Sequence, residues 1–454
     1  MDPLFAPAPA ALAVLRERRF AVTLERIFAA HPYYQRRFAE AGLGRGDVRG
    51  LADLTKLPLT TKSDYVADPE AFRLGATGAA DDTETIVWDV MYTTGSSGVP
   101  TPFVSTAYDF INILALNRNM LRLRGVASTD TILNLFPLTR YPHGAFARAM
   151  NAAAAMNIPV VAALPGRVNE RQPDIGSRLD DVVAIAARSR ATILWGVPTF
   201  IRKMTARAEE LGVRLPAVRL VFVTGEGFGE AAREDLTARL GRLGAVSPFI
   251  SVSYGATEMQ GGMVECAPGM GNHNPAPDQF LFEAVDPQTH APVADGEEGL
   301  LLLTHLDRRG TVMLRYALGD VARLTRARCP HCGALTERLT SMPRRIDGLL
   351  KIKGMLVNPQ ALVEAVTAET QVLEFQATVA KESPGDPLSM DLLVLKIVPA
   401  AEAGADLAER LQRSVQQAIG VTPRVERITA DDPIIAERGW KTKPILDLRK
   451  PATA

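Results

Sequence analysis

The segment 191–224, ATILWGVPTFIRKMTARAEELGVRLPAVRLVFVT, decides the fold. Its ends are two short apolar runs, Ala191–Trp195 and Leu220–Val223, which are typical of buried strands. Between them, Thr199–Leu211 mixes charged and apolar residues over a longer stretch, which favours an amphipathic helix. A strand, a helix and a second strand in this order predict one unit of an α/β fold.

The same alternation extends to both sides of this segment, from Thr85 to about Ser253. Further buried strands are predicted at Ile86–Met91, Thr131–Phe136, Pro159–Ala163 and Phe249–Val252. Further helices are predicted at Tyr108–Leu123, Leu179–Arg188 and Glu230–Leu240. The fold class is therefore α/β, with doubly wound layers of helices and strands.

Two other patterns follow toward the C-terminus. Short strands joined by turns are predicted at Phe280–Val285, Gly299–Thr304, Val312–Tyr316 and Val321–Leu324. A mixed α+β pattern then has strands at Leu349–Lys353, near Phe375–Ala380, at Asp391–Ile397 and at Val425–Ile428, with helices at Pro359–Thr367 and Ala405–Ile419. We predict a large N-terminal domain (1–344) with a β-rich subdomain (about 280–344), and a small C-terminal domain (345–454).

Composition excludes several classes of partner. The chain has 454 residues, with 51 Lys+Arg and 51 Asp+Glu, so no net charge attracts nucleic acid or an anionic membrane. The first 19 residues lack the pattern of a secretory signal, and we expect a cytoplasmic protein. The uncharged stretch 149–166 is interrupted by Asn151, Asn157 and Pro159, which favours a buried helix, a turn and a strand over a membrane span.

A Gly/Ser/Thr-rich loop, Tyr92–Thr101, directly follows a predicted strand. Its residues Thr93, Thr94, Gly95, Ser96, Ser97 and Gly98 offer hydroxyls and closely approachable backbone N–H groups, which suit phosphate oxygens. It is not a Walker A loop, because no Gly-Lys-Ser/Thr follows. Taken alone, a loop of this composition is more often an ordinary turn.

A second group of polar residues, Ser253-Tyr254-Gly255-Ala256-Thr257-Glu258, comes at the end of another predicted strand. Ligands bind at the carboxyl ends of strands in open α/β sheets. Tyr254 could stack on a purine, and Glu258 could hold the Mg²⁺ that accompanies ATP. The alternative is a strand-terminating turn with a solvated glutamate.

Three more charged segments follow in order: Arg315–Asp320 (RYALGD), Arg345–Gly354 (RIDGLLKIKG) and Gly439–Lys443 (GWKTK). The carboxylate of Asp320 could accept hydrogen bonds from both ribose hydroxyls. Each segment alone would be interpreted as a charged turn.

In this order and spacing, the motifs resemble the adenylate-forming superfamily of acyl-CoA synthetases, and most closely the phenylacetate–CoA ligase family. The resemblance extends from about Leu51 to the C-terminus. It implies an AMP-binding N-terminal domain and a small, mobile C-terminal lid domain. It also implies that ATP, Mg²⁺ and coenzyme A bind, and that a carboxylic acid is activated as an acyl-adenylate.

The resemblance assigns a role to each matching residue. The loop Thr93–Gly98 holds the β- and γ-phosphates, Gly225-Glu226-Gly227 and Tyr254-Gly255 line the adenine pocket, and Thr257 and Glu258 meet the α-phosphate and the magnesium ion. Asp320 binds the ribose, Arg345 reaches the nucleotide, Asp347 is the hinge, and Lys441 is the catalytic lysine. A positively charged lysine and Mg²⁺ would offset the repulsion between a carboxylate and the α-phosphate.

Three positions depart from the family pattern. Val99 stands where many relatives carry a basic residue, and Leu318 replaces the usual threonine beside Asp320. Trp440 replaces the glycine that usually precedes the catalytic lysine, so Lys443 is kept as an alternative to Lys441.

All three cysteines belong to one further pattern. Cys329 and Cys332 form a C-x-x-C, and Cys266 and His273 lie upstream, so the four residues could close a tetrahedral zinc site. Four protein ligands would make this zinc structural. Free cysteines in a reduced compartment are the alternative, and His331 competes for the fourth position.

The resulting hypothesis is an acid–CoA ligase whose substrate is a small carboxylic acid. The segment Phe136–Phe146, with Arg140 and His143, suggests an aromatic or polar-substituted acid, although core aromatics and a solvated arginine would give the same pattern. Alternatives are an adenylating enzyme that uses a carrier-protein thiol or an amine, and a non-catalytic nucleotide sensor. A zinc hydrolase would need an open metal position, which the four ligands do not offer. A homodimer is expected from the resemblance only.

Overall fold

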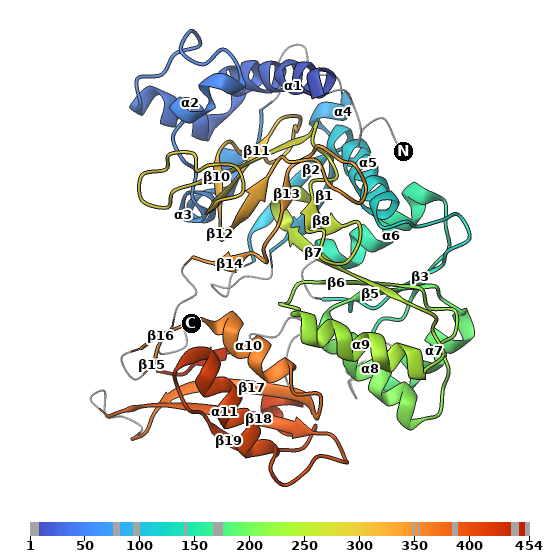
Figure 1. The fold of residues 1–454 in the computed structure, drawn as a ribbon. Coiled ribbons are helices and arrows are strands. Elements are labelled where there is room, and N and C mark those ends of the chain that lie inside the picture. Colours follow the sequence, from blue (N-terminus) through green and yellow to red (C-terminus); the bar gives the residue numbers. More distant parts are fainter. Residues whose placement is uncertain are drawn as a thin grey trace. The chain divides into compact units, whose positions relative to one another are not determined.

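The computed structural model describes residues 9–75, 82–93, 100–139, 143–166, 176–346, 350–352, 355–383, 389–436 and 445–449 (Figure 1). The chain divides into two compact units. Unit 1 contains residues 1–129, 139–159 and 253–346, and unit 2 contains residues 130–138, 160–252 and 347–454. The division into domains at residue 344 stays a prediction.

The segment that decides the fold lies in unit 2 and has the expected structure. Strand β5 (Ile193–Gly196) is followed by α8 (Pro198–Glu210) and by β6 (Leu220–Thr224), which pairs with β5 in parallel from Ile193↔Leu220. Pro198 fits the first turn of α8, where its missing N–H has no helical partner to lose. The predicted strand–helix–strand unit is confirmed.

Parallel pairing continues from β5 to β3 (Ile132–Asn134) and β4 (Val160–Ala162). Helices α7 (Leu179–Ser189), α8 and α9 (Glu230–Arg242) pack their apolar faces against these strands. The shared core includes Leu133, Leu194, Val221 and Leu236, all fully buried. Burial on the strands explains their continuous apolar runs.

The C-terminal part of unit 2 is the predicted α+β unit. A four-stranded sheet has the order β19-β18-β17-β20, with strands Arg424–Arg427, Asp391–Pro399, Val372–Lys381 and Ile445–Asp447. Helices α10 (Pro359–Thr367) and α11 (Leu407–Ile419) bury Leu362 and Leu411 against it. A short hairpin, β15 (Leu350–Ile352) and β16 (Met355–Val357), precedes α10, and the short helix α12 (Pro433–Ala436) precedes β20.

Unit 1 begins with helices and short helical turns: α1 (Pro9–Ala30), α2 (Pro32–Glu40), η1 (Leu51–Lys56), α3 (Lys62–Ala67), η2 (Pro69–Phe72) and α4 (Asp82–Thr85). The β-rich part has strands β8 (Gly261–Glu265), β9 (Asn272–His273), β10 (Phe280–Val285), β11 (Glu298–His305), β12 (Tyr316–Thr325), β13 (Arg338–Leu339) and β14 (Arg344–Arg345). They pair in the order β10-β11-β12-β13-β9-β8, while β14 adds to β12. Helices α5 (Ala107–Leu123) and α6 (Gly144–Met156) pack together, and α5 lies against β8.

The uncharged stretch 149–166 has the predicted helix, turn and strand. It begins within α6, turns at the left-handed residue Asn157 (φ 54°), and continues into β4. Along the described part of the chain, no helix has both the length and the apolar character that a membrane crossing requires.

Two of the predicted strands are different in the structure. The run Ile86–Met91 was predicted to be a buried strand of the α/β layer, but β1 (Val87–Tyr92) pairs only with β2 (Pro102–Thr106), and Val87 and Trp88 are exposed. The segment Val312–Tyr316 is a strand only at Tyr316. Arg315 has φ 43°, and the backbone of this segment bonds to Phe72 and Thr60 as well as to His305 of β11, so no regular ladder forms.

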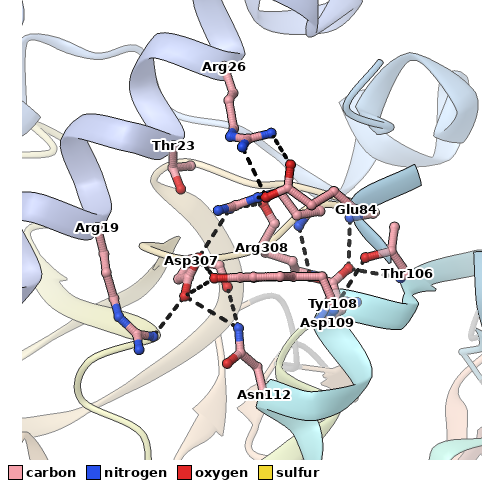
Figure 2. Close-up of polar contacts among 12 residues, drawn as sticks. Arg19, Thr23, Arg26, Glu84, Thr106, Tyr108, Asp109, Asn112, Asp307 and Arg308 are labelled. Carbon is pink, nitrogen blue, oxygen red and sulfur yellow. Dashed lines mark hydrogen bonds and ion pairs between the residues drawn. The ribbon is translucent and has the colours of Figure 1, made fainter. Parts of the chain in front are cut away.

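Partly buried charges connect α1 to the rest of unit 1 (Figure 2). Arg26 makes a bidentate ion pair with Glu84, with N–O distances of 2.6 and 2.9 Å. Arg19 pairs with Asp307 at 2.8 Å, and Thr23 Oγ1 donates to the carbonyl of Leu306 over 2.8 Å. The loop that follows β11 is therefore held by the N-terminal helix.

Candidate nucleotide site

The centre of the candidate site is a tight hairpin in unit 1. Strand β7 (Phe249–Ala256) runs into the 3₁₀ turn η3 (Thr257–Met259) and returns as β8. Gly255 and Gly262 lie opposite each other, and a Cβ on Gly262 would come within 2.7 Å of the carbonyl oxygen of Tyr254. Only glycine allows the two strands to approach this closely, and Thr257 and Glu258 are thereby placed at the hairpin tip.

Side chains from β12 and β14 meet the end of β7. The hydroxyl of Tyr254 donates to Oδ2 of Asp320 over 2.7 Å. The guanidinium of Arg345 approaches Oδ1 of Asp320 at 3.3 Å and donates to the carbonyl of Leu318 over 2.7 Å. Burial and the Asp320 carboxylate raise the pKa of Tyr254 well above its usual value, so this hydroxyl remains a donor.

Glu258 lies half-buried beside the same strand. Its carboxylate accepts a hydrogen bond from the hydroxyl of Tyr316, the first residue of β12. Burial raises the pKa of Glu258, while this bond and the charges of Arg345 and Lys62 act in the opposite direction. The structure therefore brings together four residues that the sequence predicted for the site: Tyr254, Glu258, Asp320 and Arg345.

A buried histidine fixes the backbone at Glu258. His305 Nδ1 accepts from the backbone N–H of Met313 (3.0 Å), so its Nε2 carries the proton and donates to the carbonyl of Glu258 (3.0 Å). Burial lowers the pKa of His305 well below its usual value, which keeps the ring neutral. Sequence reasoning missed both His305 and Tyr316, because His305 belongs to no motif and Tyr316 was quoted without a role.

The predicted phosphate loop begins and ends at two paired residues. Thr93 N donates to the carbonyl of Thr101 (3.0 Å), and Thr101 N donates to Oγ1 of Thr93 (3.1 Å). Thr93 therefore closes the base of the loop. The predicted residues Thr94, Gly95, Ser96, Ser97 and Gly98 lie outside the described residues, as do Val99, Asp347, Trp440, Lys441 and Lys443.

The predicted Gly225-Glu226-Gly227 segment lies in unit 2, directly after β6. Gly225 has φ 90°, a conformation that favours glycine. The carboxylate of Glu226 accepts from the backbone N–H and the hydroxyl of Thr199 (3.2 and 2.8 Å) in the first turn of α8. Glu226 thus stabilises the N-terminus of a helix, where an anion is favoured.

The four predicted metal ligands come together in unit 1. The ligand atoms of Cys266, His273, Cys329 and Cys332 all lie within 4.8 Å of one another. Cys266 Sγ is 3.8 Å from Cys329 Sγ, and Cys332 Sγ is 3.8 Å from His273 Nε2. Ligands at about 2.0–2.3 Å from a tetrahedral zinc ion would be separated by similar distances, of about 3.5–3.8 Å.

Three different backbone segments supply these ligands. Cys266 follows β8, His273 is in β9, and the turn Cys329–Ala334 is closed by the Cys329 N–H donating to the carbonyl of Ala334 (2.9 Å). The thiol of Cys266, followed by His273, lowers the pKa of Cys332, a direction that favours the thiolate needed by a metal. His331, the competing ligand, does not belong to this group.

Comparisons with known proteins identify the family and several relatives of this chain. The profile of the AMP-binding enzyme family matches residues 55–316, more than half of the chain. A phenylacetate–coenzyme A ligase of Thermus thermophilus is 27% identical over 97% of both chains, and one of Escherichia coli is 26% identical over 99% of this chain and 98% of its own. A crystal structure of 2-hydroxyisobutyryl-CoA ligase in complex with R3-HIB-AMP superimposes with a TM-score of 0.78 at 20% identity, over 98% of this chain and 90% of the other.

Proposed function

Because the chain belongs to the AMP-binding enzyme family, we propose that it is an ATP-dependent ligase that joins a carboxylic acid to coenzyme A. A carboxylate oxygen attacks the α-phosphorus of ATP, pyrophosphate leaves, and an acyl-adenylate forms. The sulfur of coenzyme A then attacks the acyl carbon, and AMP leaves. The observation that carries the proposal is the meeting of Tyr254, Glu258, Asp320 and Arg345 beside one hairpin.

The described residues can perform distinct parts of the first half-reaction. In this proposal Asp320, which Tyr254 orients, accepts hydrogen bonds from the ribose hydroxyls of the nucleotide. In this proposal Thr257, at the hairpin tip, donates its hydroxyl to the α-phosphate, and Arg345 adds positive charge. Glu258 offers a carboxylate oxygen of the kind that Mg²⁺ prefers, and a bound Mg²⁺ would neutralise charge on the phosphates.

Coenzyme A is the acceptor that the relatives favour. Both of the relatives described above are named phenylacetate–coenzyme A ligases, and they are covered almost from end to end. A carrier-protein thiol and an amine share the same first half-reaction, so they stay alternatives that the acceptor assay below distinguishes. A nucleotide sensor would release no pyrophosphate.

The acid is proposed to be aromatic. The names of the relatives support this choice, and the segment Phe136–Phe146 is the one that we assign to the acyl pocket. Within it, Phe136 and His143 are buried, whereas Arg140, which motivated a polar-substituted acid, lies outside the described residues.

We also propose that Cys266, His273, Cys329 and Cys332 hold one structural zinc ion. The spacing of their ligand atoms and their burial support this assignment. The ion would connect the segment after β8, and thus the hairpin that carries Glu258, to the turn after β12.

Pyrophosphate release from a panel of aryl and alkyl acids tests the function. The full chain is incubated with MgATP and each acid, first without and then with coenzyme A, and thioester formation is measured separately by loss of free thiol. We expect aryl acids to give the highest acid-dependent rate of pyrophosphate release. We also expect one molecule of coenzyme A to be consumed for each molecule of AMP formed. Pyrophosphate release without thiol loss would favour the amine or carrier-protein acceptor, and no release with any acid would contradict the proposal.

A further inference from the structure

One buried arginine contacts both segments that frame the candidate site in unit 1. Arg148 lies on α6 and is 4% exposed. Its guanidinium makes a bidentate pair with Asp89, at 2.8 and 3.1 Å, and the Nη2 atom also donates to Oε1 of Gln260 (2.5 Å). None of these three residues belongs to a motif that the sequence singled out.

The two partners of Arg148 belong to different parts of the site. Asp89 is in β1, four residues before Thr93, which closes the base of the phosphate loop with Thr101. Gln260 directly follows the turn η3 and has the left-handed φ of 56°. Its side-chain Nε2 donates back to the carbonyl of Thr257 over 2.7 Å. A single guanidinium therefore connects the base of the phosphate loop to the turn that carries Thr257 and Glu258.

We propose that Arg148 is a positioning residue for the nucleotide, which sets the base of the phosphate loop against the Thr257–Glu258 turn. This inference rests on the proposed function. The planar guanidinium has donors at fixed angles, so the positions of Asp89 and Gln260 determine each other. ATP has to contact both segments at once, and a displacement of about 1 Å at such a site can lower the rate about 100-fold.

A second buried arginine, Arg308, contacts the strand that leaves the phosphate loop. Arg308 Nη2 donates to the carbonyl of Val104 and to the hydroxyl of Ser105 in β2, both at 3.1 Å. Arg308 lies three residues after His305, which donates to the carbonyl of Glu258. Arg308 is thus connected to the turn through the chain segment that it shares with His305, whereas Arg148 contacts Gln260, the residue after the turn, directly.

The Arg26–Glu84 pair offers a matched control. It is also a bidentate arginine–carboxylate pair with little exposure, and it lies in the same unit (Figure 2). It joins α1 to α4 and contacts neither η3 nor Thr93. If Arg148 served stability alone, replacing either arginine by methionine would have the same kind of effect.

The test compares Arg148→Met, Arg148→Lys and Arg26→Met in the full chain. We measure the KM for MgATP and kcat in acid-dependent pyrophosphate exchange, the Kd of a non-hydrolysable ATP analogue, and the melting temperature. We expect Arg148→Met to raise the KM and the Kd at least about tenfold. Arg148→Lys should recover part of this loss, because it restores the charge without the planar geometry. Arg26→Met should lower the melting temperature and leave both constants within about twofold of wild type.

Equal KM and Kd values in Arg148→Met and Arg26→Met, with lowered melting temperatures in both, would overturn the inference. If Arg148→Met does not fold, Arg148→Lys and Gln260→Leu test the inference instead. Gln260→Leu removes one hydrogen-bond partner of Arg148 and keeps the Arg148–Asp89 pair. An unchanged Kd in both of these variants would also overturn it. A wild-type protein that binds no nucleotide would instead contradict the proposed function, so the two failures are distinguishable.

Discussion

The hydroxyl of Tyr254 donates a hydrogen bond to Oδ2 of Asp320 over 2.7 Å, which joins the end of β7 to the middle of β12. The two residues are 66 positions apart in the sequence. Arg345 approaches the other oxygen of the same carboxylate at 3.3 Å. The carboxylate proposed to bind ribose is therefore oriented before any nucleotide arrives, which reduces the entropy lost on binding.

Removing this hydroxyl should weaken nucleotide binding. A hydrogen bond to a charged group contributes about 1.5–3 kcal/mol, so Tyr254→Phe should raise the KM for MgATP about tenfold or more, by freeing Asp320 to rotate. Tyr108→Phe is the matched control, because the Tyr108 hydroxyl also donates to a mostly buried aspartate, Asp307, at 3.0 Å (Figure 2). Steady-state kinetics at saturating acid would measure both. A KM in Tyr254→Phe no higher than in Tyr108→Phe would contradict the role given to Tyr254.

Replacing Glu258 by glutamine should lower activity without lowering the stability of the fold. Burial raises the folded-state pKa of Glu258 above its unfolded value. The folded state then binds the proton more tightly, so this group costs stability as pH rises from its unfolded pKa of about 4.3 through the folded pKa. Above its folded pKa the ionised carboxylate carries this full cost, and neutral glutamine avoids it.

We therefore expect Glu258→Gln to melt at the same or a higher temperature than wild type at pH 7, with the difference shrinking toward pH 4. Pyrophosphate exchange should fall about 100-fold or more, because a ligand for Mg²⁺ is lost. Thermal melts over this pH range, together with a Mg²⁺ titration of activity, provide the measurement. A lower melting temperature at pH 7 would show that the bond from Tyr316 outweighs the cost of burial.

The catalytic lysine is assigned from the sequence alone. Lys441→Ala should abolish acid-dependent pyrophosphate exchange, since the charge that offsets the attack of an anion on the α-phosphate is removed. Lys443→Ala is the natural comparison, two residues away in the same segment. Circular dichroism would check that both variants fold. The reverse order of activities would assign the role to Lys443.

Metal analysis of protein purified without chelators should find about one zinc ion per chain. Cys332→Ser should lose the metal and lower the melting temperature, because the link between the β8 hairpin and the turn after β12 is then broken. His331→Ala should keep the zinc ion and the wild-type melting temperature, since His331 does not belong to the group of four ligands. Metal-free wild-type protein with an unchanged melting temperature after chelator treatment would reject the site.

Hydrophobic patterns predict much of this fold, because they report local geometry. The runs at Ile193–Gly196 and Leu220–Thr224 become parallel strands, and helix α10 has the predicted bounds Pro359–Thr367. Periodicity carries no information about which sheet a strand joins. For this reason the sequence predicts the run at Ile86–Met91 to lie in the α/β layer, although β1 forms a separate two-stranded sheet with β2 among the described residues.

The sequence predicts a functional residue when that residue belongs to a recognisable motif. The sequence identifies four site residues because each stands in a short motif that is typical of adenylate-forming enzymes: Tyr254, Glu258, Asp320 and Arg345. It identifies the three cysteines and His273 because few residue types serve as zinc ligands. The sequence alone also named Lys441, on which the adenylation hypothesis depends. None of these motifs predicts a distance between residues that are far apart in the sequence. The hydrogen bond between Tyr254 and Asp320 therefore could not be predicted from them.

Only the tertiary structure decided which residues support the site. Arg148, Asp89, Gln260 and His305 have no motif, and they act through contacts with residues 47 to 112 positions away in the chain. Contacts over such separations depend on how α6, β1 and β11 pack around the hairpin, which is a property of the whole core. Local sequence therefore determined the elements and the chemistry of this protein, and long-range packing determined how the reacting groups are held.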